Sequence, residues 1–505
     1  MKPTSHPMLS CEQAGRLEAK RFAGDEAREW PAMQQAGRAV AAAVLNDFRE
    51  IGGFPARGRV LVLAGKGHNG GDALLAAGAI LTAFPAARVD LVLAFGARAL
   101  RPLATRAYRS LVALAGDRLA LRPPAAVHGS WDLCLDGVFG FQFRAPAGPA
   151  VAALLERVNQ LPVRLRAAVD LPSAGLFRAD FTYATGLVKT PVIAAGNAGR
   201  IRYLDLGFFT GAEPGNDRVL TAALLAPLAA LRPASSDKRS QGHLLVLGGS
   251  RSYPGAVLMT VLAALRSGAG LVTALVPAAL APAFAARAPE AMWVAWPETP
   301  AGGLALAGRP LLEARLPRAT ALVIGPGLGC EAETQALVLD LVKSVRLPVL
   351  LDADALQPEI VRAAKTRLVL TPHAGEFARL AGGGRRRAGA AVGSSAHLRA
   401  FCRQPGATVV LKGPVTRLSE GGVVYHSFFG GPVLARGGSG DLLAGLIGGL
   451  LAQTPQAPLL AASRGVVWHG IAADLLARAH GQTAVATTQL LDFLSVALRE
   501  SGHEQ

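Results

Sequence analysis

The chain has 505 residues, of which 51% are hydrophobic and 17% charged, with 58 glycines. This composition excludes a disordered chain and predicts two or three domains of α/β type with many tight turns. The four cysteines form no C-x-x-C pair, so we expect neither a zinc site nor a disulfide framework. The net charge of +17 fits an arginine-rich protein that acts on anionic small molecules better than it fits a nucleic-acid binder.

The first segment, "MKPTSHPMLSCEQAGRLEAKRF", becomes charged before a long apolar core can form. It lacks the pattern of a signal peptide, and we expect a cytoplasmic protein. Strands are predicted at residues 59–64, 89–94, 133–136 and 165–170, with alanine-rich helical segments between them. Such alternation predicts a parallel sheet covered on both faces, as in a Rossmann-like α/β/α sandwich.

The turn after the first strand, "GKGHNGGD" at residues 65–72, matches the G-x-G-x-x-G fingerprint of dinucleotide coenzymes. That fingerprint also requires an acidic residue about 20 positions further on, at the end of the second strand. Asp90 has about the right separation but lies at the start of its strand, at the wrong edge of the sheet. A hydride-transferring dehydrogenase is therefore disfavoured.

Three strand ends carry oxygen-bearing side chains beside glycines: "GKGHNGGD", "DGVFGFQ" at 136–142 and "DLPSAG" at 170–175. Each turn alone is better explained by turn and N-cap preferences. Because the carboxyl ends of parallel strands meet at one edge, the three together favour a site. Asn, Asp and Ser oxygens suit a hard cation such as K⁺ better than a soft metal.

With "PAMQQAGRAVA" upstream and "ADFTYATG" downstream, these motifs resemble the YjeF N-terminal family over about residues 9–220. Its members are NAD(P)H-hydrate epimerases, which interconvert the two C6 epimers of hydrated nicotinamide. The resemblance implies K⁺ ligands at Asn69, Asp136 and Ser173, with Asp170 as the acid/base candidate. It implies substrate contacts at His68, Asn69, Gly70, Gly71, Asp72, Gly140, Phe141, Gln142, Phe143, Arg144, Ala145, Pro146 and Asp170.

The chain departs from the family pattern in the substrate-contacting turns. His68 stands where the family has asparagine, Ala73 replaces a glycine, and "GFQ" replaces "GTG" after Phe139. These departures leave two alternatives open: a weakened or retuned epimerase, or a domain kept for ligand binding or for a structural role.

The stretch at residues 225–243 interrupts the pattern with prolines, serines and charge, so we place a domain boundary near 226–238 and predict domains at 1–232 and 233–505. A second α/β series follows, with strands in "HLLVLGGS", "GLVTALVP", "ALVIGPGLG", "LPVLLDADAL", "TRLVLTPHAGE" and "TVVLKG". The one dense basic run, "GGGRRRAG" at 382–389, has no aromatic residues to stack bases.

The segment "ARGGSGDLLAGLIGGLLA" at 435–452 predicts a glycine-rich turn followed by a buried helix that is too short to span a membrane. Backbone N–H groups of residues 437–440 would form an anion site at the helix start. Asp441 in the first turn either complements the helix dipole or acts as a base beside a phosphate, and the G-G-S-G-D run favours the base.

Other predicted strand ends supply polar groups that could join this site: Lys412, Thr416, the glycines of 323–329, Asp352, Asp354, His373 and Glu376. His373 could cap a turn or touch a substrate ring. With "GGSRSYPGA", "GPGLG", "TPHAGEF" and "GGSGD", the segment from about 236 to 498 resembles the YjeF C-terminal family, a ribokinase-like branch of NAD(P)H-hydrate dehydratases.

This second resemblance implies ADP as co-substrate, Mg²⁺ as cofactor and Asp441 as general base. Implied substrate contacts are Ala256, Gly327, Gly329, His373 and Asp441, and implied nucleotide contacts are Lys412, Gly413, Pro414, Val415, Thr416 and Gly440.

Together, the two resemblances predict a bifunctional enzyme that epimerises the hydrates NADHX and NADPHX and dehydrates the S form. We expect no nucleic-acid or membrane partner, and the sequence allows a homo-oligomer. The alternative is a ribokinase-like small-molecule kinase whose N-terminal domain binds or supports without epimerase activity.

Overall fold

The computed structural model describes residues 2–382 and 394–501, so most of the basic run at 382–389 lies outside the described residues. The chain divides into two compact units. The N-terminal unit comprises His6–Gly215 and Ala477–Gln482, and the C-terminal unit comprises Met1–Ser5, Asn216–Leu476 and Thr483–Gln505. The changeover after Gly215 lies upstream of the composition break at 226–238; the assignment of 1–232 and 233–505 to two family domains stays a prediction.

The N-terminal unit is built on a seven-stranded sheet of order β4-β3-β2-β5-β6-β7-β9, in which every neighbouring pair is parallel. Its strands are β2 (Arg59–Ala64), β3 (Arg88–Leu93), β4 (Leu119–Leu121), β5 (Trp131–Gly137), β6 (Val163–Val169), β7 (Phe181–Thr185) and β9 (Arg200–Leu204). All four predicted strands of this half are confirmed; the first has the predicted ends, and the ends of the other three are shifted by one or two residues.

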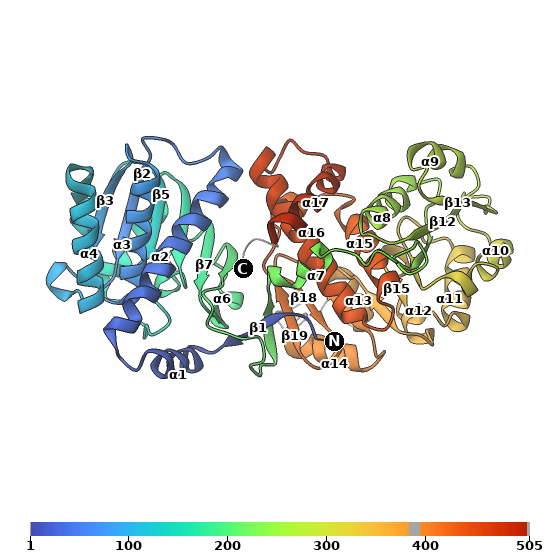
Figure 1. Ribbon diagram of the computed structural model, residues 1–505, viewed down its shortest axis with the longest axis horizontal. Helices are drawn as coiled ribbons and strands as arrows, with labels where there is room; N and C mark the ends of the chain where they lie inside the picture. The colour runs from blue at the N-terminus through green and yellow to red at the C-terminus, as the bar shows by residue number, and fades with distance from the viewer. Residues whose placement is uncertain (1, 383–393, 502–505) are drawn as a thin grey trace. The chain divides into compact units, whose positions relative to one another are not determined.

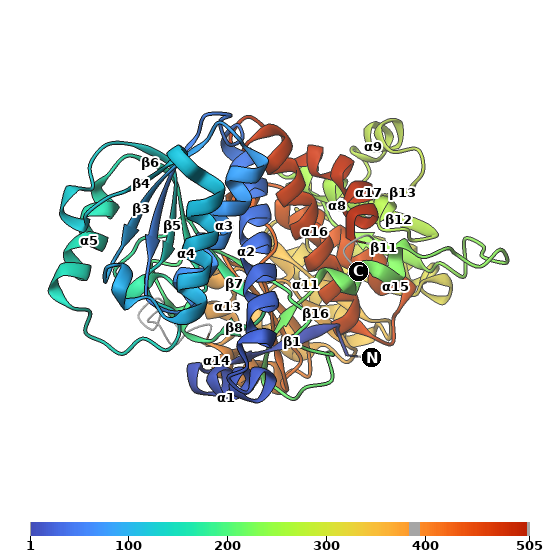
Figure 2. The ribbon, with the colours of Figure 1, turned by 60° about the vertical axis from the view of Figure 1, so that its left-hand side comes forward.

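Alternation along β2 buries both faces of this sheet. Val60 and Val62 belong to a core with helices α2, α3 and α4, whereas Leu61 and Leu63 belong to a core with α5. Figure 2 shows α5 on the other side of the sheet from α3 and α4. The helices are α1 (Cys11–Phe22), α2 (Glu26–Phe48), α3 (His68–Ala83), α4 (Pro102–Ala115), α5 (Pro149–Gln160) and α6 (Pro191–Ala194). The predicted three-layer sandwich is confirmed.

Outside this sheet, β1 (Ser5–Leu9) pairs in parallel with β8 (Val188–Lys189). The pairing aligns Leu9 with Lys189 and fixes the backbone of Lys189, a residue of the functional site described below.

In the C-terminal unit the strands follow the order β13-β12-β11-β14-β15-β16-β17-β18-β19-β10. Figure 1 labels β12, β13, β15, β18 and β19 among them. The pairs from β13 to β17 are parallel, and β18 forms antiparallel pairs with β17 and β19. The strands are β10 (Asp217–Leu220), β11 (His243–Leu247), β12 (Leu271–Pro277), β13 (Met292–Trp296), β14 (Ala321–Ile324), β15 (Val349–Leu351), β16 (Leu368–Leu370), β17 (Thr408–Leu411), β18 (Thr416–Ser419) and β19 (Val424–Ser427).

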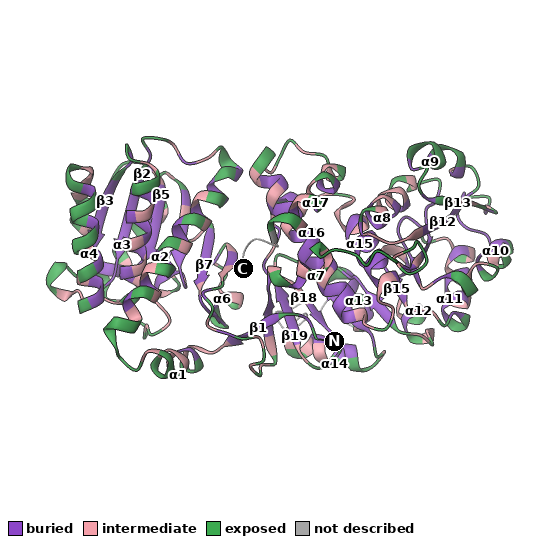
Figure 3. Ribbon diagram, in the orientation of Figure 1, coloured by how far each residue is buried: buried purple, intermediate pink, exposed green. Residues whose placement is uncertain are grey.

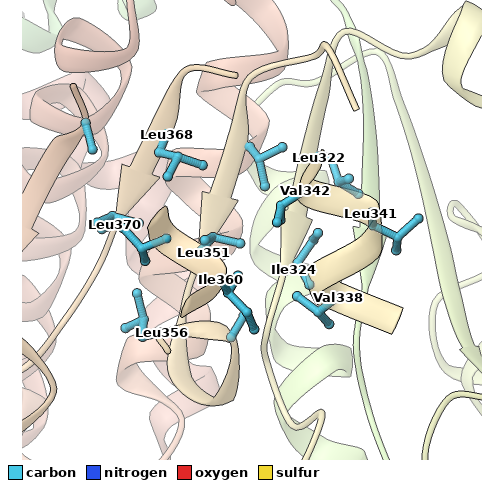
Figure 4. Packing of buried hydrophobic residues seen from close by; sticks show 14 of the residues in the cluster. Leu322, Ile324, Val338, Leu341, Val342, Leu351, Leu356, Ile360, Leu368 and Leu370 are labelled. Carbon is cyan, nitrogen blue, oxygen red and sulfur yellow. The ribbon is translucent and has the colours of Figure 1, made fainter. Parts of the chain in front are cut away.

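Helices again cover both faces of this sheet. On one face, Leu322 and Ile324 of β14 pack with Val338 and Leu341 of α11, as Figure 4 shows. On the other, α15 packs so closely that a Cβ on Gly448 would lie 2.4 Å from Val323. The helices are α7 (Ala226–Ala229), α8 (Pro254–Arg266), α9 (Ala281–Arg287), α10 (Arg309–Glu313), α11 (Ala332–Ser344), α12 (Pro358–Ala363), α13 (Ala374–Leu380), α14 (Ser395–Arg403), α15 (Ser439–Gln453), α16 (Pro458–His480) and α17 (Leu490–Ser501).

The predicted core helix is confirmed as α15, in which every residue from Leu442 to Ala452 is buried. Helix α16 has the length and apolarity of a membrane span, but 83% of its most apolar window is buried inside the fold, as in a core helix. Figure 3 shows that the strands of both units are buried, whereas the outer faces of the helices are exposed.

Candidate functional sites

The N-terminal unit has a cavity of about 510 Å³ beyond the carboxyl ends of β2, β5 and β6, the edge at which parallel sheets bind ligands. Most of the predicted substrate contacts line it: His68, Asn69, Asp72, Gly140, Phe141, Gln142, Phe143, Arg144, Pro146 and Asp170. The three other predicted contacts, Gly70, Gly71 and Ala145, are not among its lining residues.

Gly70 and Gly71 are buried at close approaches of the backbone rather than facing the cavity. A Cβ on Gly70 would lie 2.2 Å from the carbonyl oxygen of Gly65, and a Cβ on Gly71 would lie 2.7 Å from the sulfur of Met33. These glycines let α3 begin directly against the turn. Its N-cap, Gly67, makes no side-chain capping bond, so the first backbone N–H groups of α3 stay available at the cavity.

The predicted K⁺ ligands are brought together by one set of hydrogen bonds. The Ser173 hydroxyl donates to Oδ1 of Asp136 at 2.6 Å, and the Ser173 amide donates to Oδ2 at 2.8 Å. The backbone N–H of Phe139 donates to Oγ of Ser173, and Nδ2 of Asn69 donates to the carbonyl oxygen of Phe139, both at 2.9 Å.

This oxygen-rich set fits a monovalent cation. The Asp136 side chain is fully buried, and within the described residues its carboxyl group has no cationic partner. Burial raises its pKa to about 6, although hydrogen bonds from Ser173 act in the opposite direction. A bound K⁺ would offset the charge that this carboxyl group carries when ionised.

Asp170 lies one residue past β6 with a left-handed backbone, at φ 68°. The strand therefore ends at Val169, and the predicted strand end at Asp170 is wrong by this one residue. The Asp170 carboxyl group forms an ion pair with the ammonium group of Lys189, whose side chain is only 2% exposed. The same ammonium group lies 5.0 Å from the centre of the Phe141 ring.

His68 is the departure from the family pattern, and its side chain is more than half exposed. Its Nε2 lies 3.1 Å from Oε2 of Glu29 on α2, so part of the ring is engaged outside the substrate-binding turn. Sequence reasoning missed Glu18, Lys66, Arg101 and Lys189, which also line the cavity. Glu18 lies on α1, seven positions and thus two helical turns after Cys11, so both residues are on one face of the helix. The local sequence does not indicate that this face is the one toward the cavity.

In the C-terminal unit, Asp441 lies in the first turn of α15, as predicted. The N-cap Gly438 has φ 89°, and a Cβ there would lie 2.5 Å from the sulfur of Met259, so this turn requires glycine. A Cβ on Gly440 would lie 3.3 Å from Nζ of Lys412. The helix N-terminus and the Lys412 ammonium group thus face one small space, as an anion site requires.

Lys412 is held by a buried carboxyl group at the end of β15. Its Nζ lies 3.1 Å from Oδ1 of Asp352, which also accepts a hydrogen bond of 2.7 Å from the Thr371 hydroxyl. Burial lowers the pKa of Lys412, but Asp352 and Glu376 outweigh burial and raise it. Burial, together with Asp352, raises the pKa of Asp441 to about 6.

The predicted glycine-rich turn at 323–329 packs against the start of α8. A Cβ on Gly327 would lie 2.4 Å from the carbonyl oxygen of Tyr253 and 3.1 Å from Cβ of Ala256, so these two predicted substrate contacts are neighbours. The backbone N–H of Gly329 donates to Oδ2 of Asp354 at 2.9 Å. Asp354 therefore fixes this turn.

His373 caps α13. Its Nδ1 accepts hydrogen bonds from the backbone N–H groups of Gly375 and Glu376, and Oε2 of Glu376 accepts the backbone N–H of His373 at 2.8 Å. The capping interpretation is confirmed. Because Nδ1 accepts, a neutral ring carries its proton on Nε2, and 62% of the side chain remains exposed for contact with a ligand.

His469 of α16 was missed by sequence reasoning. It is 5% exposed and hydrogen-bonded to the backbone of Ser439, at the start of α15. Burial lowers its pKa to about 4, so it supports this turn as a neutral ring. The apolar sequence on either side of His469 gives no signal of such a contact.

Comparison with known proteins covers both units. Residues 244–495 match the family described as NAD(P)H-hydrate dehydratase, and residues 31–195 match the YjeF-related protein N-terminus. The chain is 35% identical over 503 residues to a bifunctional NAD(P)H-hydrate repair enzyme of Moorella thermoacetica, covering 94% of this chain and 93% of that protein. It is 38% identical over 504 residues to the protein of the same name from Gloeobacter violaceus, covering 94% of each. A solved ribokinase-like superfamily protein of Enterococcus faecalis aligns with TM-score 0.50 and 28% identity over 57% of this chain and 98% of that chain.

Proposed function

The chain belongs to the family of bifunctional NAD(P)H-hydrate repair enzymes, and from that membership we propose which unit catalyses which step. The N-terminal unit interconverts the R and S hydrates at C6 of the nicotinamide ring. The C-terminal unit dehydrates the S hydrate with ADP as co-substrate. The observation that carries the proposal is the group at the start of α15, where Asp441 and Lys412 share an anion-binding turn.

Dehydration requires a better leaving group than hydroxide. Asp441 takes the proton from the C6 hydroxyl, whose oxygen then accepts a phosphoryl group from the nucleotide. The phosphate leaves with the C6–O bonding electrons, and loss of a proton from C5 restores the dihydropyridine. Lys412 and the backbone N–H groups before Asp441 stabilise the charge on the transferring group.

The charges around Asp441 favour a divalent cation with the nucleotide. Asp352, Asp354 and Asp441 interact electrostatically, and Lys412 is the one ammonium group acting on Asp441 among the described residues. Asp354, which is not paired with Lys412, and the nucleotide phosphates would hold Mg²⁺. When bound, this ion neutralises phosphate charge.

In the N-terminal unit, the hydrate occupies the cavity with C6 near Asp170. Asn69, Asp136 and Ser173 would hold K⁺, and their hydrogen bonds to Phe139 connect this set to the loop that lines the cavity. Asp170 moves the proton of the C6 hydroxyl, and the ion pair with Lys189 holds its carboxyl group in place.

The full chain should be assayed on purified R and S hydrates with Mg²⁺ and either ADP or ATP, following the near-ultraviolet absorbance of the dihydronicotinamide. We expect complete recovery from both epimers with ADP, and epimer interconversion without recovery when nucleotide is omitted. A stable phosphorylated product without recovery would instead identify a small-molecule kinase. Recovery from S alone would identify the N-terminal unit as a binding or supporting domain.

A further inference from the structure

Three carboxyl groups and one buried ammonium group line the cavity of the N-terminal unit. The carboxyl groups belong to Glu18 of α1, Asp72 of α3 and Asp170, and the ammonium group to Lys189. Lys189 forms its ion pair with Asp170. Within the described residues, neither Glu18 nor Asp72 makes a hydrogen bond or ion pair, so both carboxyl groups are left to the cavity.

The remaining cationic side chains of the cavity cannot balance this excess, because Lys66, Arg101 and Arg144 are exposed to water. Burial raises the pKa of Glu18 to about 7; Lys189 lowers it, and Asp170 and Glu29 raise it. Burial, Asp170 and Glu18 raise the pKa of Asp72 much further. The cavity therefore places the ion pair of Asp170 and Lys189 beside two carboxyl groups that keep their protons to a higher pH than usual.

We propose that Glu18 is a catalytic residue of the epimerase, donating a proton to ring nitrogen N1 while Asp170 accepts the proton of the C6 hydroxyl. This inference rests on the proposed epimerase function of the N-terminal unit. Glu18 fits better than Asp72 because a proton donor must also give up its proton near the working pH.

The two carboxyl groups complete a balanced reaction without any co-reactant. As Asp170 takes the hydroxyl proton, the O–H electrons form the C6 carbonyl bond and the C6–N1 bond breaks with its electrons moving to N1. Glu18 gives N1 a proton, and the ring opens to an aldehyde. After rotation about C5–C6, Glu18 takes the proton back, N1 attacks the other face of the carbonyl carbon, and Asp170 returns its proton to oxygen.

The proposal predicts a distinct pH dependence. The groups acting on Glu18 are Lys189, Asp170 and Glu29, Asp72 of α3 interacts with it across the cavity, and Cys11 shares its helix. Because Glu18 must be protonated in the free enzyme, kcat/KM for epimerisation should fall as the pH rises through about 7.

The test is Glu18→Gln in the full chain, with Glu12→Gln as matched control, because Glu12 is on the same helix but 75% exposed and paired only with Arg16. Interconversion of the purified hydrates is measured without nucleotide, so that no dehydration takes place. The uncatalysed rate of interconversion is subtracted. We expect about a hundredfold loss of kcat with KM within threefold, and loss of the fall above pH 7. Glu12→Gln should keep the wild-type rate and pH profile.

The possible outcomes distinguish the role of Glu18 from the epimerase function itself. A thermal melt of the Glu18→Gln sample beside wild type reports on the fold of the N-terminal unit, and Glu18→Asp should recover part of the lost rate. If Glu18→Gln stays within threefold of wild type, or keeps the same pH profile, the role of Glu18 is wrong while the epimerase function stands. If the wild-type chain itself does not interconvert the epimers, the proposed function fails first.

Discussion

Asp90 and Asp441 have carboxyl groups in opposite surroundings, although both lie near an end of a core element. Asp90 accepts hydrogen bonds from Arg59, Arg122 and the Trp131 ring nitrogen, and these lower its pKa against the effect of burial. Among residues 2–382 and 394–501, no side chain donates such a hydrogen bond to Asp441, and its pKa is raised. Asp90 therefore stabilises the amino edge of a sheet, as its position in the strand predicts, whereas Asp441 is available for proton transfer.

Asp441→Asn should abolish dehydration and leave nucleotide binding intact, because the amide keeps the shape of the carboxyl group but cannot accept a proton. A loss of at least a hundredfold in kcat is expected, with the nucleotide Kd unchanged within about threefold. In the wild type, kcat/KM should fall as the pH drops through about 6, where Asp441 becomes protonated. Substantial turnover by the variant would contradict this role.

The same substitution should stabilise the C-terminal unit. A carboxyl group whose pKa is raised in the folded state costs stability above that pKa, and the cost disappears below its unfolded value near 4. For a shift to about 6, we expect Asp441→Asn to raise the free energy of unfolding by about 1 to 3 kcal/mol at pH 8 and to change it little at pH 4. Denaturant melts at the two pH values provide the measurement.

Asp136→Asn should remove a dependence of stability on K⁺. In the wild type, KCl should raise the melting temperature of the N-terminal unit above that in choline chloride of equal ionic strength, because a cation that binds only the folded state stabilises it, by about 2.7 kcal/mol at a hundred times its Kd. The variant has no buried carboxylate to neutralise and should melt alike in both salts. Equal K⁺ stabilisation of wild type and variant would contradict the site.

At the scale of elements, the start of α15 depends on where glycines stand in the turn. A Cβ on Gly440 would lie beside the Lys412 ammonium group, whereas a Cβ on Gly437 would meet nothing within 4 Å. Gly440→Ala should therefore weaken nucleotide binding about tenfold, or about 1.4 kcal/mol, and Gly437→Ala should change it less than threefold. Calorimetric titration with ADP compares the two, and equal affinities would show that no phosphate approaches Gly440.

The central strands were predictable because buried parallel strands form short apolar runs that end in glycine and aspartate. The strands that escaped prediction include β4, β13 and the hairpin of β18 and β19. Strand β4, Leu119–Leu121, has no fully buried residue, and β13, Met292–Trp296, has only one. Sequence patterns record burial, so the edge strands β4 and β13 leave a weak signal, whereas β19 was missed although all four of its residues are buried.

The site residues also divide into those that the sequence identifies and those that it does not. Asp170, Asp441 and Lys412 follow predicted strands or begin a predicted helix, and local motifs identify them. Glu18 and His469 reach their sites through tertiary packing of helices whose sequences carry no motif. The resemblance of both halves to one repair family is confirmed by relatives that match over nearly the whole chain.

At the scale of the whole molecule, the N-terminal unit is not continuous in sequence, because it includes Ala477–Gln482 from the end of α16. Arg478 donates to the carboxyl group of Asp47 at 2.9 Å, and Gln482 donates to Glu50. A composition break at 226–238 gives no sign of this late segment, so a fragment of residues 1–232 would lack part of the unit.

Arg478→Ala should destabilise the N-terminal unit selectively. The Asp47 side chain is fully buried and shares its charge between Arg202 and Arg478, which lower its pKa against burial. Because Arg202 remains, we expect a loss of about 2 kcal/mol rather than the full cost of an unpaired buried charge. The loss should be present at pH 7 and shrink as the pH falls below about 4, because the unfolded chain protonates Asp47 there while the ion pairs keep its folded pKa lower. Arg49→Ala, an exposed neighbour on the same unit, is the control and should leave the melt unchanged. If Arg478→Ala melts like wild type while fragment 1–232 is unstable, the fragment's weakness comes from other lost residues and not from this ion pair.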